Sequence, residues 1–263
     1  MQERHLNRDK YFEEQAITTE KYVIPFISSI RSINPDLRIL EIGCGEGGNL
    51  KPFLDLGCEV TGVDILEGKI SNAHKFFDKH PLKKNLNLII SDIYDIGDEF
   101  NERFDVIFMR DVLEHIHDQE KFMEHAKKFL KPDGLFFLGF PPWQYPFGGH
   151  QQMCHSRFLS RLPYFHLLPG PLYPWVLKSF GEQYGLIRDL LEIRQTRITI
   201  ERFKKILKKE KYEVRKSIFY FINPNYEIKF GLRPRKQSAI ISGIPWFRNY
   251  FITTCYYILS KEV

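Results

Sequence analysis

A glycine-rich turn directly after an apolar strand constrains this chain more than any other feature. The segment from Leu37 to Ile42 is a predicted strand, and it runs into a turn that contains Gly43, Gly45 and Gly48. These glycines fit the spacing G-x-G-x-x-G, in which bare backbone can approach a nucleotide-like ligand. The turn alone does not distinguish NAD from other adenosine-containing cofactors.

Acidic residues at the ends of the predicted strands narrow the choice of ligand. Glu41 lies just before the first glycine, where it can face a cationic or hydrogen-bond-donating group, whereas the pyrophosphate of NAD would repel it. The next predicted strand ends in Asp64, which can accept hydrogen bonds from both hydroxyls of a ribose, with Ile65 beside the base. A third predicted strand ends in Asp92, which can accept from an adenine amino group.

At these residues the chain resembles the class I S-adenosylmethionine-dependent methyltransferases, particularly the small-molecule branch with a Glu-x-Gly-x-Gly turn and a Leu-Glu-His-Ile segment. The resemblance covers about residues 36–142 and includes the Leu-Glu-His-Ile segment at Leu113–Ile116. It implies that the cofactor is S-adenosylmethionine, with its methionine part at the turn, its ribose on Asp64, and its adenine framed by the residues near Asp92. The cofactor-binding residues implied in this way are Glu41, Gly43, Cys44, Gly45, Asp64, Ile65, Asp92, Ile93, Arg110 and Val112.

Strand and helix patterns alternate through the first half of the chain, which indicates a parallel sheet with helices on both faces. We therefore expect an α/β fold: a Rossmann-like, doubly wound, seven-stranded sheet, mostly parallel, with the antiparallel edge hairpin that the resemblance implies. Ligands of such sheets bind at the carboxyl ends of the strands. Helices are expected at residues 17–33, 46–56, 67–79, 119–130 and from 200, a turn at 131–134, and the last two strands at 212–222 and 251–260.

The length of 263 residues suits one domain with a large core, and we expect a single methyltransferase domain over residues 1–263. Within it, residues 143–198 break the alternation with prolines among many aromatic residues. An insert at this place can act as a substrate cap, and its aromatic side chains can equally form the core of the insert itself. Residues 223–249 form a longer link than a hairpin needs and are expected to add a second wall.

The composition is that of an ordinary soluble globular protein, with 43% hydrophobic and 27% charged residues. The sequence shows no apolar run long enough to cross a bilayer, so we expect a cytoplasmic protein without a transmembrane segment. The four cysteines lack the spacing of a zinc site and are expected to be reduced, structural thiols. The net charge of +5 comes from the carboxyl-terminal part, which leaves peripheral contact with an anionic membrane open. Oligomeric state stays open as well.

Methyl transfer from a sulfonium requires an acceptor held in line and, for a hydroxyl acceptor, a group that removes a proton. Histidine can do this near neutral pH. The candidate catalytic residues are His150, which follows Gly148 and Gly149 just past the fifth strand, and His155. A surface or structural role is the alternative for each. No metal is expected, because no carboxylate or cysteine set completes a ligand shell around this pair.

These observations favour an S-adenosylmethionine-dependent methyltransferase acting on a small or lipid-like molecule with an apolar or aromatic part, at oxygen, nitrogen or carbon. Methylation of RNA or protein is an alternative, supported by the basic run at residues 204–216. Acidic residues interrupt that run and no RNA-binding module is visible, so nucleic acid is not an expected partner. A non-catalytic cofactor-binding protein is a third reading, which the intact motifs disfavour, and an NAD-dependent oxidoreductase is the fourth.

Overall fold

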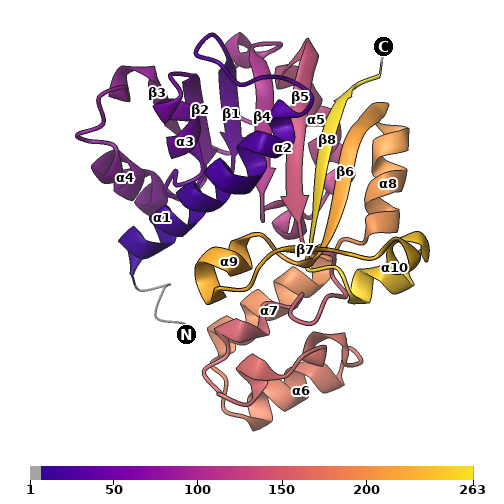
Figure 1. The fold of residues 1–263 in the computed structure, drawn as a ribbon. Coiled ribbons are helices and arrows are strands. Elements are labelled where there is room, and N and C mark those ends of the chain that lie inside the picture. Colours follow the sequence, from indigo (N-terminus) through magenta and orange to yellow (C-terminus); the bar gives the residue numbers. More distant parts are fainter. Residues whose placement is uncertain (1–6, 263) are drawn as a thin grey trace.

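The computed structural model describes residues 7–262, and it is built around one sheet with the strand order β3-β2-β1-β4-β5-β8-β6-β7 (Figure 1). The first five strands are parallel, whereas β8, β6 and β7 continue the sheet in antiparallel pairing. The expected fold is confirmed, with a short eighth strand added. The strands are β1 (Arg38–Ile42), β2 (Glu59–Asp64), β3 (Leu86–Ile90), β4 (Phe104–Arg110), β5 (Leu130–Phe140), β6 (Tyr212–Ile222), β7 (Arg235–Lys236) and β8 (Thr254–Lys261).

Helices cover both faces of the sheet, because alternate residues of its central strands are apolar on both sides. In β4, Val106 and Phe108 join one buried cluster, and Ile107 and Met109 join the other. The first cluster includes side chains of α1 to α4, and the second includes side chains of α5 and α8. The helices are α1 (Arg8–Thr18), α2 (Ile24–Ser28), α3 (Leu50–Asp55), α4 (Glu67–Phe76), α5 (Gln119–Ala126), α6 (Leu172–Ser179), α7 (Tyr184–Thr196), α8 (Ile200–Lys209), α9 (Asn225–Phe230) and α10 (Ala239–Gly243).

The first helix begins earlier than expected. The predicted range of 17–33 is wrong at its start: α1 begins at Arg8, where the side chain of Asn7 accepts a hydrogen bond from the Lys10 N–H over 3.1 Å. Such a cap satisfies a backbone donor that the helix cannot pair itself. A π-helical turn, Thr19–Val23, then leads into α2. Phe12 stacks on Phe76 of α4 with ring centroids 4.4 Å apart, so the early turns of α1 are held by packing across the fold.

Several other predicted boundaries shift by a few residues. The helix expected from residue 46 starts at Leu50, because the glycine turn occupies the preceding residues. The turn expected at 131–134 lies within the bounds of β5, where the pairing with β4 moves from Leu130 opposite Phe104 to Leu135 opposite Val106. Residues 131–134 are therefore looped out of the ladder as a bulge. The helix expected from residue 200 is confirmed, with the Thr199 hydroxyl accepting from the Arg202 N–H over 3.0 Å.

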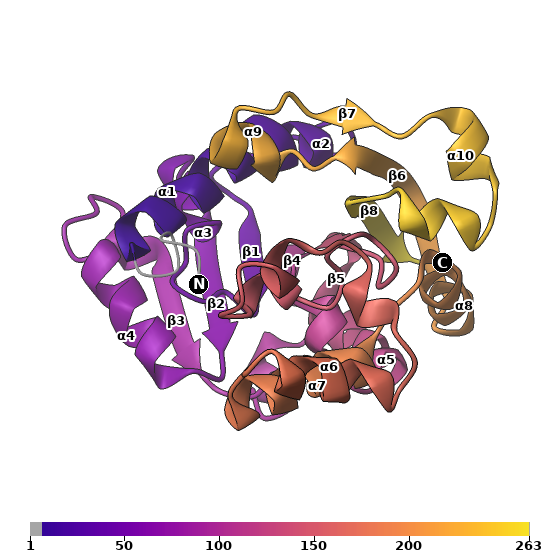
Figure 2. The ribbon, with the colours of Figure 1, turned by 90° about the horizontal axis from the view of Figure 1, so that it is seen from below.

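Two segments lie at the edge of the sheet where the parallel strands end (Figures 1 and 2). The first, residues 143–198, carries α6 and α7 and is called the cap; its two ends meet where the Trp143 N–H donates to the Ile198 carbonyl over 2.8 Å. The second, residues 223–250, carries α9, β7 and α10 and is called the strap. The Tyr164 hydroxyl of the cap donates to the Tyr250 carbonyl of the strap over 3.1 Å. Both segments thus cover the expected ligand side.

The aromatic residues of the cap divide between its interior and its surface. Phe165 and Tyr173 belong to a small core that the cap forms for itself, so the reading of an internal core holds for these two. Phe158, Trp175 and Tyr184 are exposed.

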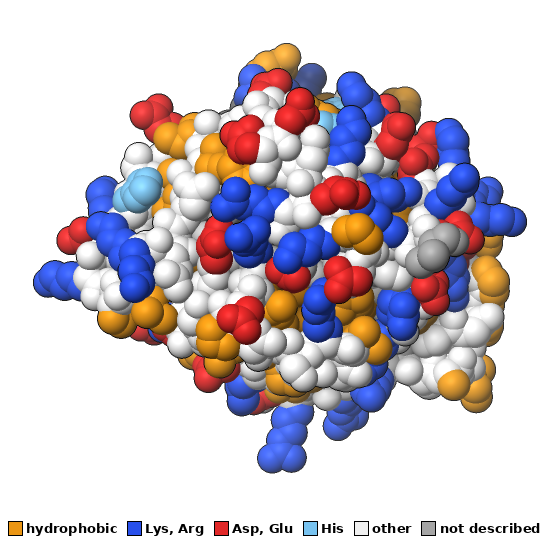
Figure 3. Space-filling view, turned by 90° about the horizontal axis from the view of Figure 1, so that it is seen from above, with side chains coloured by type: hydrophobic (Ala, Val, Ile, Leu, Met, Phe, Trp, Pro, Cys, Tyr) orange, Lys and Arg blue, Asp and Glu red, His pale blue; other side chains and the backbone are white. Residues whose placement is uncertain are grey.

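On the opposite side of the molecule, where the parallel strands begin, basic and acidic side chains are interspersed (Figure 3). Within residues 7–262, no helix combines the length and hydrophobicity needed to span a membrane.

Candidate active site

The glycine turn after β1 has the conformation that its sequence predicts. Gly43 and Gly45 have φ angles of +70° and +54°, which glycine adopts without the steric cost that a Cβ adds. The N–H of Gly43 donates to the Val63 carbonyl over 2.9 Å, which ties the turn to β2. A Cβ on Gly43 would lie 2.7 Å from a methyl carbon of Val112. The turn and the loop after β4 are therefore in direct contact, as the implied cofactor site requires.

Cys44, inside this turn, is buried against Gly62 of β2, where a Cβ would lie 2.8 Å from the cysteine sulfur. Burial, together with the nearby carboxyl groups of Glu41 and Asp64, raises the pKa of the Cys44 thiol well above its usual value. A protonated, buried thiol is a poor nucleophile. Cys44 therefore shapes the turn by packing.

Glu41 is the most informative side chain of the site. It is 1% exposed, and its Oε1 accepts a hydrogen bond from Asn49 Nδ2 over 2.7 Å, whereas its Oε2 is buried without a hydrogen-bond partner. Burial raises the pKa of this carboxyl to about 8, although the Asn49 hydrogen bond and the positive charge of Arg110 act in the opposite direction. A buried polar atom without a partner costs stability and needs an explanation, and a ligand that donates a hydrogen bond supplies one.

Arg110 provides the complementary group at the end of β4. Its side chain is only 4% exposed, and its Nε lies 3.7 Å from Asp111 Oδ2. Its Nη1 is buried without a hydrogen-bond partner. Because β1 and β4 are adjacent, with Glu41 opposite Phe108, Glu41 and Arg110 lie at the same edge of the sheet, and each leaves a buried polar atom without a hydrogen-bond partner. This pair suits the ammonium and the carboxylate of an amino acid group, such as the methionine part of the implied cofactor.

Asp64 fastens the backbone around the site. Its Oδ2 accepts from the Gly45 N–H over 2.8 Å and its Oδ1 accepts from the Leu66 N–H over 2.9 Å. Each carboxylate oxygen can accept a further hydrogen bond, so a ribose can still be held here. Ile65, the next residue, is 67% exposed, which leaves its side chain available to a flat ligand such as a base.

The residues implied for adenine lie two and three positions past the end of β3. Asp92 is exposed, and its Oδ1 accepts from the Tyr94 N–H over 3.0 Å. Ile93 is 7% exposed and packs in the core, and its carbonyl oxygen lies 3.1 Å from His125 Nε2. The Ser91 N–H donates to the Asp64 carbonyl over 3.1 Å, so this loop is joined to the ribose-binding end of β2.

Helix α1 supplies a wall that the sequence did not reveal. Burial raises the pKa of the Tyr11 hydroxyl to about 12, and the next largest influences are charged groups of the site: Asp111, Arg110, Glu46 and Glu41. The Tyr11 hydroxyl is therefore close enough to these groups for their charges to act on it. A Cβ on Gly48 would lie 2.6 Å from the Phe12 carbonyl, so α1 also presses against the glycine turn. Asn7, a preferred N-cap residue ahead of this segment, is the signal that could have placed the helix.

His150 belongs to a compact group of three titratable side chains. Its ring lies 5.0 Å from that of His115, and one ligand atom each from Glu114, His115 and His150 lie within 4.8 Å of one another. Both carboxyl oxygens of Glu114 are buried without a hydrogen-bond partner, and burial, helped by Asp111, raises its pKa well above the usual range. Such a group can share a proton or hold a divalent cation. Glu114 is thus a carboxylate near His150 that the pair of His150 and His155 did not include, and the expectation of no metal stays a prediction.

His155 is held in a different way. Its Nδ1 lies 3.1 Å from Glu182 Oε2, and the Glu182 carboxylate also accepts from the N–H groups of His155 and Ser156 over 3.0 and 2.9 Å. Burial raises the pKa of Glu182, but these hydrogen bonds outweigh it and hold the pKa below its usual value. His155 thus takes part in a structural junction of the cap. The cluster around His150 is formed by other residues.

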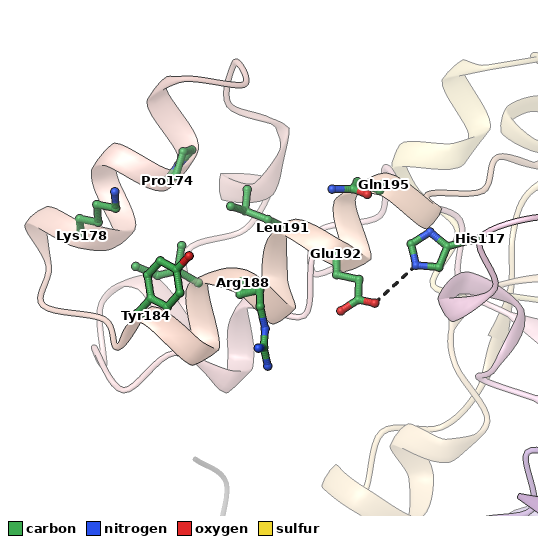
Figure 4. A pocket seen from close by; sticks show the side chains of 9 residues that line it. His117, Pro174, Lys178, Tyr184, Arg188, Leu191, Glu192 and Gln195 are labelled. Carbon is green, nitrogen blue, oxygen red and sulfur yellow. Dashed lines mark hydrogen bonds and ion pairs between the residues drawn. The ribbon is translucent and has the colours of Figure 1, made fainter. Parts of the chain in front are cut away.

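A cavity of about 390 Å³ lies in the cap between α6 and α7 (Figure 4). Its wall includes His117 from the loop after β4, whose Nε2 lies 3.4 Å from Glu192 Oε1 on α7. This contact joins the cap to the segment that carries Glu114 and His115. The remaining lining combines apolar with basic and polar side chains: Pro174, Lys178, Tyr184, Ile187, Arg188, Leu191 and Gln195.

Comparison with known proteins assigns the chain to a family. The sequence profile of a methyltransferase domain family matches residues 13–162. Ubiquinone biosynthesis O-methyltransferases are similar in sequence. The mitochondrial one of Homo sapiens is 35% identical over 104 residues, which are 39% of this chain and 28% of the relative. The one of Bradyrhizobium diazoefficiens is 35% identical over 115 residues, which are 43% of this chain and 44% of the relative. The chain thus spans less than half the length of these two relatives.

Solved structures show the same fold over nearly the whole chain. A putative sarcosine dimethylglycine methyltransferase from Galdieria sulphuraria superposes with a TM-score of 0.61 at 12% identity and covers 94% of this chain and 87% of its own. A geranyl diphosphate C-methyltransferase from Streptomyces coelicolor was solved with Mg²⁺, geranyl diphosphate and S-adenosyl-L-homocysteine. It superposes with a TM-score of 0.57 at 13% identity, and the match covers 92% of this chain and 79% of that structure. The family profile covers more than half of the chain, and the protein therefore belongs to the class I S-adenosylmethionine-dependent methyltransferases.

Proposed function

We propose that this protein transfers the methyl group of S-adenosylmethionine to a hydroxyl group of a small, lipid-like acceptor with an apolar or aromatic part. The observation that carries the proposal is the buried pair of Glu41 and Arg110, which leaves one acceptor and one donor for a zwitterionic amino acid group. The cap supplies the remaining support, because it lies at the same edge of the sheet as this pair and contains a cavity.

The residues at the strand ends fit the cofactor part by part. Glu41 would accept from its ammonium, Arg110 would donate to its carboxylate, and Asp64 would accept from its ribose hydroxyls. Asp92 would accept from the adenine amino group between Ile65 and Ile93. When bound, the cofactor supplies a methyl group on a positively charged sulfur, which needs no further activation. The protein has to hold the acceptor in line and exclude water.

The cap is proposed to select the acceptor. Its cavity presents Pro174, Ile187 and Leu191 beside the Tyr184 ring, a lining that suits an apolar chain or ring. The two sequence relatives are named O-methyltransferases of ubiquinone biosynthesis, and one of the structural neighbours is named for geranyl diphosphate. These names support a hydroxyl acceptor with an apolar part, which is why oxygen is proposed as the methylated atom.

His150 is proposed to take the proton of that hydroxyl. The imidazole of His150 lies near His115 and the buried Glu114. A neighbouring carboxyl group can orient an imidazole or accept a proton from it. Burial lowers the pKa of His115, so this ring is available in its neutral form at neutral pH. His155 is not proposed as the base, because Glu182 already holds its Nδ1.

The proposal is tested with S-adenosylmethionine carrying an isotopically labelled methyl group. The purified protein is incubated separately with a lipid extract, a pool of RNA and a pool of protein, and transfer of the label is measured. We expect label in the lipid extract, at an oxygen atom, and none with Glu41→Gln, which removes the negative charge for the ammonium. Label in RNA or protein alone, or transfer at nitrogen or carbon only, would contradict the proposed acceptor.

A further inference from the structure

A second cavity, of about 460 Å³, lies where the cap, the first turn of α8 and the strap meet. Three of its lining residues are arginines: Arg194 from α7, Arg197 from the link to α8, and Arg202 from α8 itself. Trp143 and the strap residue Trp246 also line it. Three cations at one cavity repel one another, and an anion bound among them removes that repulsion.

The three guanidinium groups have no acidic partner within the described part of the chain. Arg194 Nη1 donates to the His166 carbonyl over 3.0 Å, and its guanidinium carbon lies 5.5 Å from the centre of the Tyr173 ring. Arg202 Nη1 donates to the Arg197 carbonyl over 3.4 Å. No ion pair joins any of the three to a carboxylate among residues 7–262. These contacts orient Arg194 and Arg202, and none of them compensates the charge of the three arginines.

Glu201, next to Arg202 in sequence, does not balance this charge. Its carboxylate is buried, and both the Nε and an Nη of Arg248 lie 2.9 Å from its Oε1. The same oxygen accepts from the Trp246 N–H over 2.9 Å, and Oε2 accepts from Asn249 Nδ2 over 2.6 Å. Glu201 is therefore neutralised by Arg248 and committed to holding the strap. His166, in the cavity wall, adds no cation near neutral pH, because burial lowers its pKa to about 4.

The exposed part of the cavity lining is aromatic as well as basic. Trp246 and Tyr250 line it and are 56% and 39% exposed, and the neighbouring strap residues Ile240 and Phe247 are exposed as well. Aromatic side chains beside basic ones are typical of surfaces where one end of a ligand is charged and the other apolar. The cavity thus combines a site for an anion with a surface for an apolar group.

We infer that the cavity lined by Arg194, Arg197 and Arg202 binds the phosphate group of a phosphate ester. The planar guanidinium fork matches phosphate oxygens in pairs, which favours phosphate over a single-charge anion such as chloride. That phosphate can belong to the headgroup of an anionic lipid or to a soluble ester. The inference goes beyond the proposed methyl transfer, because it concerns a binding site that can be occupied with or without the cofactor.

The test compares two variants with the same change in charge. Arg197→Gln/Arg202→Gln removes two of the three cavity arginines, whereas Arg157→Gln/Arg161→Gln removes two exposed cap arginines that do not line the cavity. Binding of glycerol 3-phosphate is measured by titration calorimetry. Binding to phosphatidylcholine vesicles with and without phosphatidylglycerol is measured by sedimentation. Both are done without cofactor and at one fixed salt concentration, and melting temperatures confirm that the variants fold.

We expect the cavity variant to lose about tenfold or more in affinity for at least one phosphate probe, while the control variant stays within about twofold of the wild type. Loss confined to the phosphatidylglycerol vesicles assigns the site to a lipid headgroup, and loss confined to glycerol 3-phosphate assigns it to a soluble ester. Equal losses in the two variants, or no binding of either probe by the wild type, would overturn the inference. Since no step uses the cofactor, either result leaves the proposed methyl transfer to its own test.

Discussion

Asn49 donates a hydrogen bond of 2.7 Å to Oε1 of Glu41, while Oε2 of the same carboxyl group stays buried without a hydrogen-bond partner. The pKa of Glu41 is raised to about 8 by burial, so the carboxyl is largely protonated at neutral pH in the ligand-free protein. A positively charged ammonium beside it favours the ionised form. The site is therefore arranged to exchange a proton for a cation.

We expect S-adenosylhomocysteine, which carries such an ammonium, to release up to about one proton from Glu41 when it binds near pH 7. Calorimetric titration in two buffers with different ionisation enthalpies measures this release directly. The Glu41→Gln variant should show none and bind more weakly, whereas Glu114→Gln should keep the release. Equal binding enthalpies in both buffers for the wild type would contradict the assignment of Glu41 to the ammonium.

The same pKa predicts how stability depends on pH. Between about pH 4.5 and 8, folded Glu41 keeps a proton that the unfolded chain gives up, so this residue makes the free energy of unfolding fall as pH rises. Glu41→Gln removes this dependence, because the amide stays neutral in both states. We expect the melting temperature of the ligand-free variant to rise relative to that of the wild type as the pH increases from 5 to 8. A constant difference over this range would show that Glu41 is ionised in the folded protein.

Asp64→Ala should weaken the binding of S-adenosylhomocysteine by about 2–4 kcal/mol, because charge-assisted hydrogen bonds to the ribose are lost. A side chain that only faced the ligand would leave fold stability nearly unchanged. The structure adds a cost of about 1–3 kcal/mol, since Asp64 also accepts from the N–H groups of Gly45 and Leu66. Calorimetry and thermal melting separate the two effects. A lower melting temperature with unchanged affinity would make Asp64 purely structural.

The parts of the fold that could be predicted are those fixed by local patterns. The end of β2 at Asp64 and both bounds of β6 agree with the prediction, because a run of apolar or alternating residues marks a strand wherever it packs. The start of α1 could not be found from such a pattern, since its residues are held by contacts with the distant α4, and only the N-cap residue Asn7 marks it in the sequence. Its role as a wall depends on the tertiary fold alone.

The residues of the candidate site likewise divide into those that the sequence predicted and those that it did not. Glu41 is predicted from its position at a strand end and Arg110 from the resemblance, and the structure places both at one edge of the sheet, because β1 and β4 pair in parallel. Glu114 was not named. Its approach to His150 depends on how residues 143–150 fold back over the loop after β4, which no spacing in the sequence specifies. Contacts between segments far apart in the chain are therefore what the sequence left undetermined.

The histidines of the cap give the sharpest remaining test. If His150 accepts the acceptor's proton, His150→Ala should lower turnover by about 10²–10⁴-fold and leave the affinity for S-adenosylhomocysteine within about twofold. His155→Gln is the matched control: its ring is bonded to Glu182, so we expect a lower melting temperature and turnover near that of the wild type. Turnover and its pH profile are measured for both variants. Wild-type turnover in His150→Ala would remove it as the base. Loss of wild-type turnover in EDTA, restored by a divalent cation, would show instead that turnover needs a metal, for which Glu114, His115 and His150 are the candidate ligands.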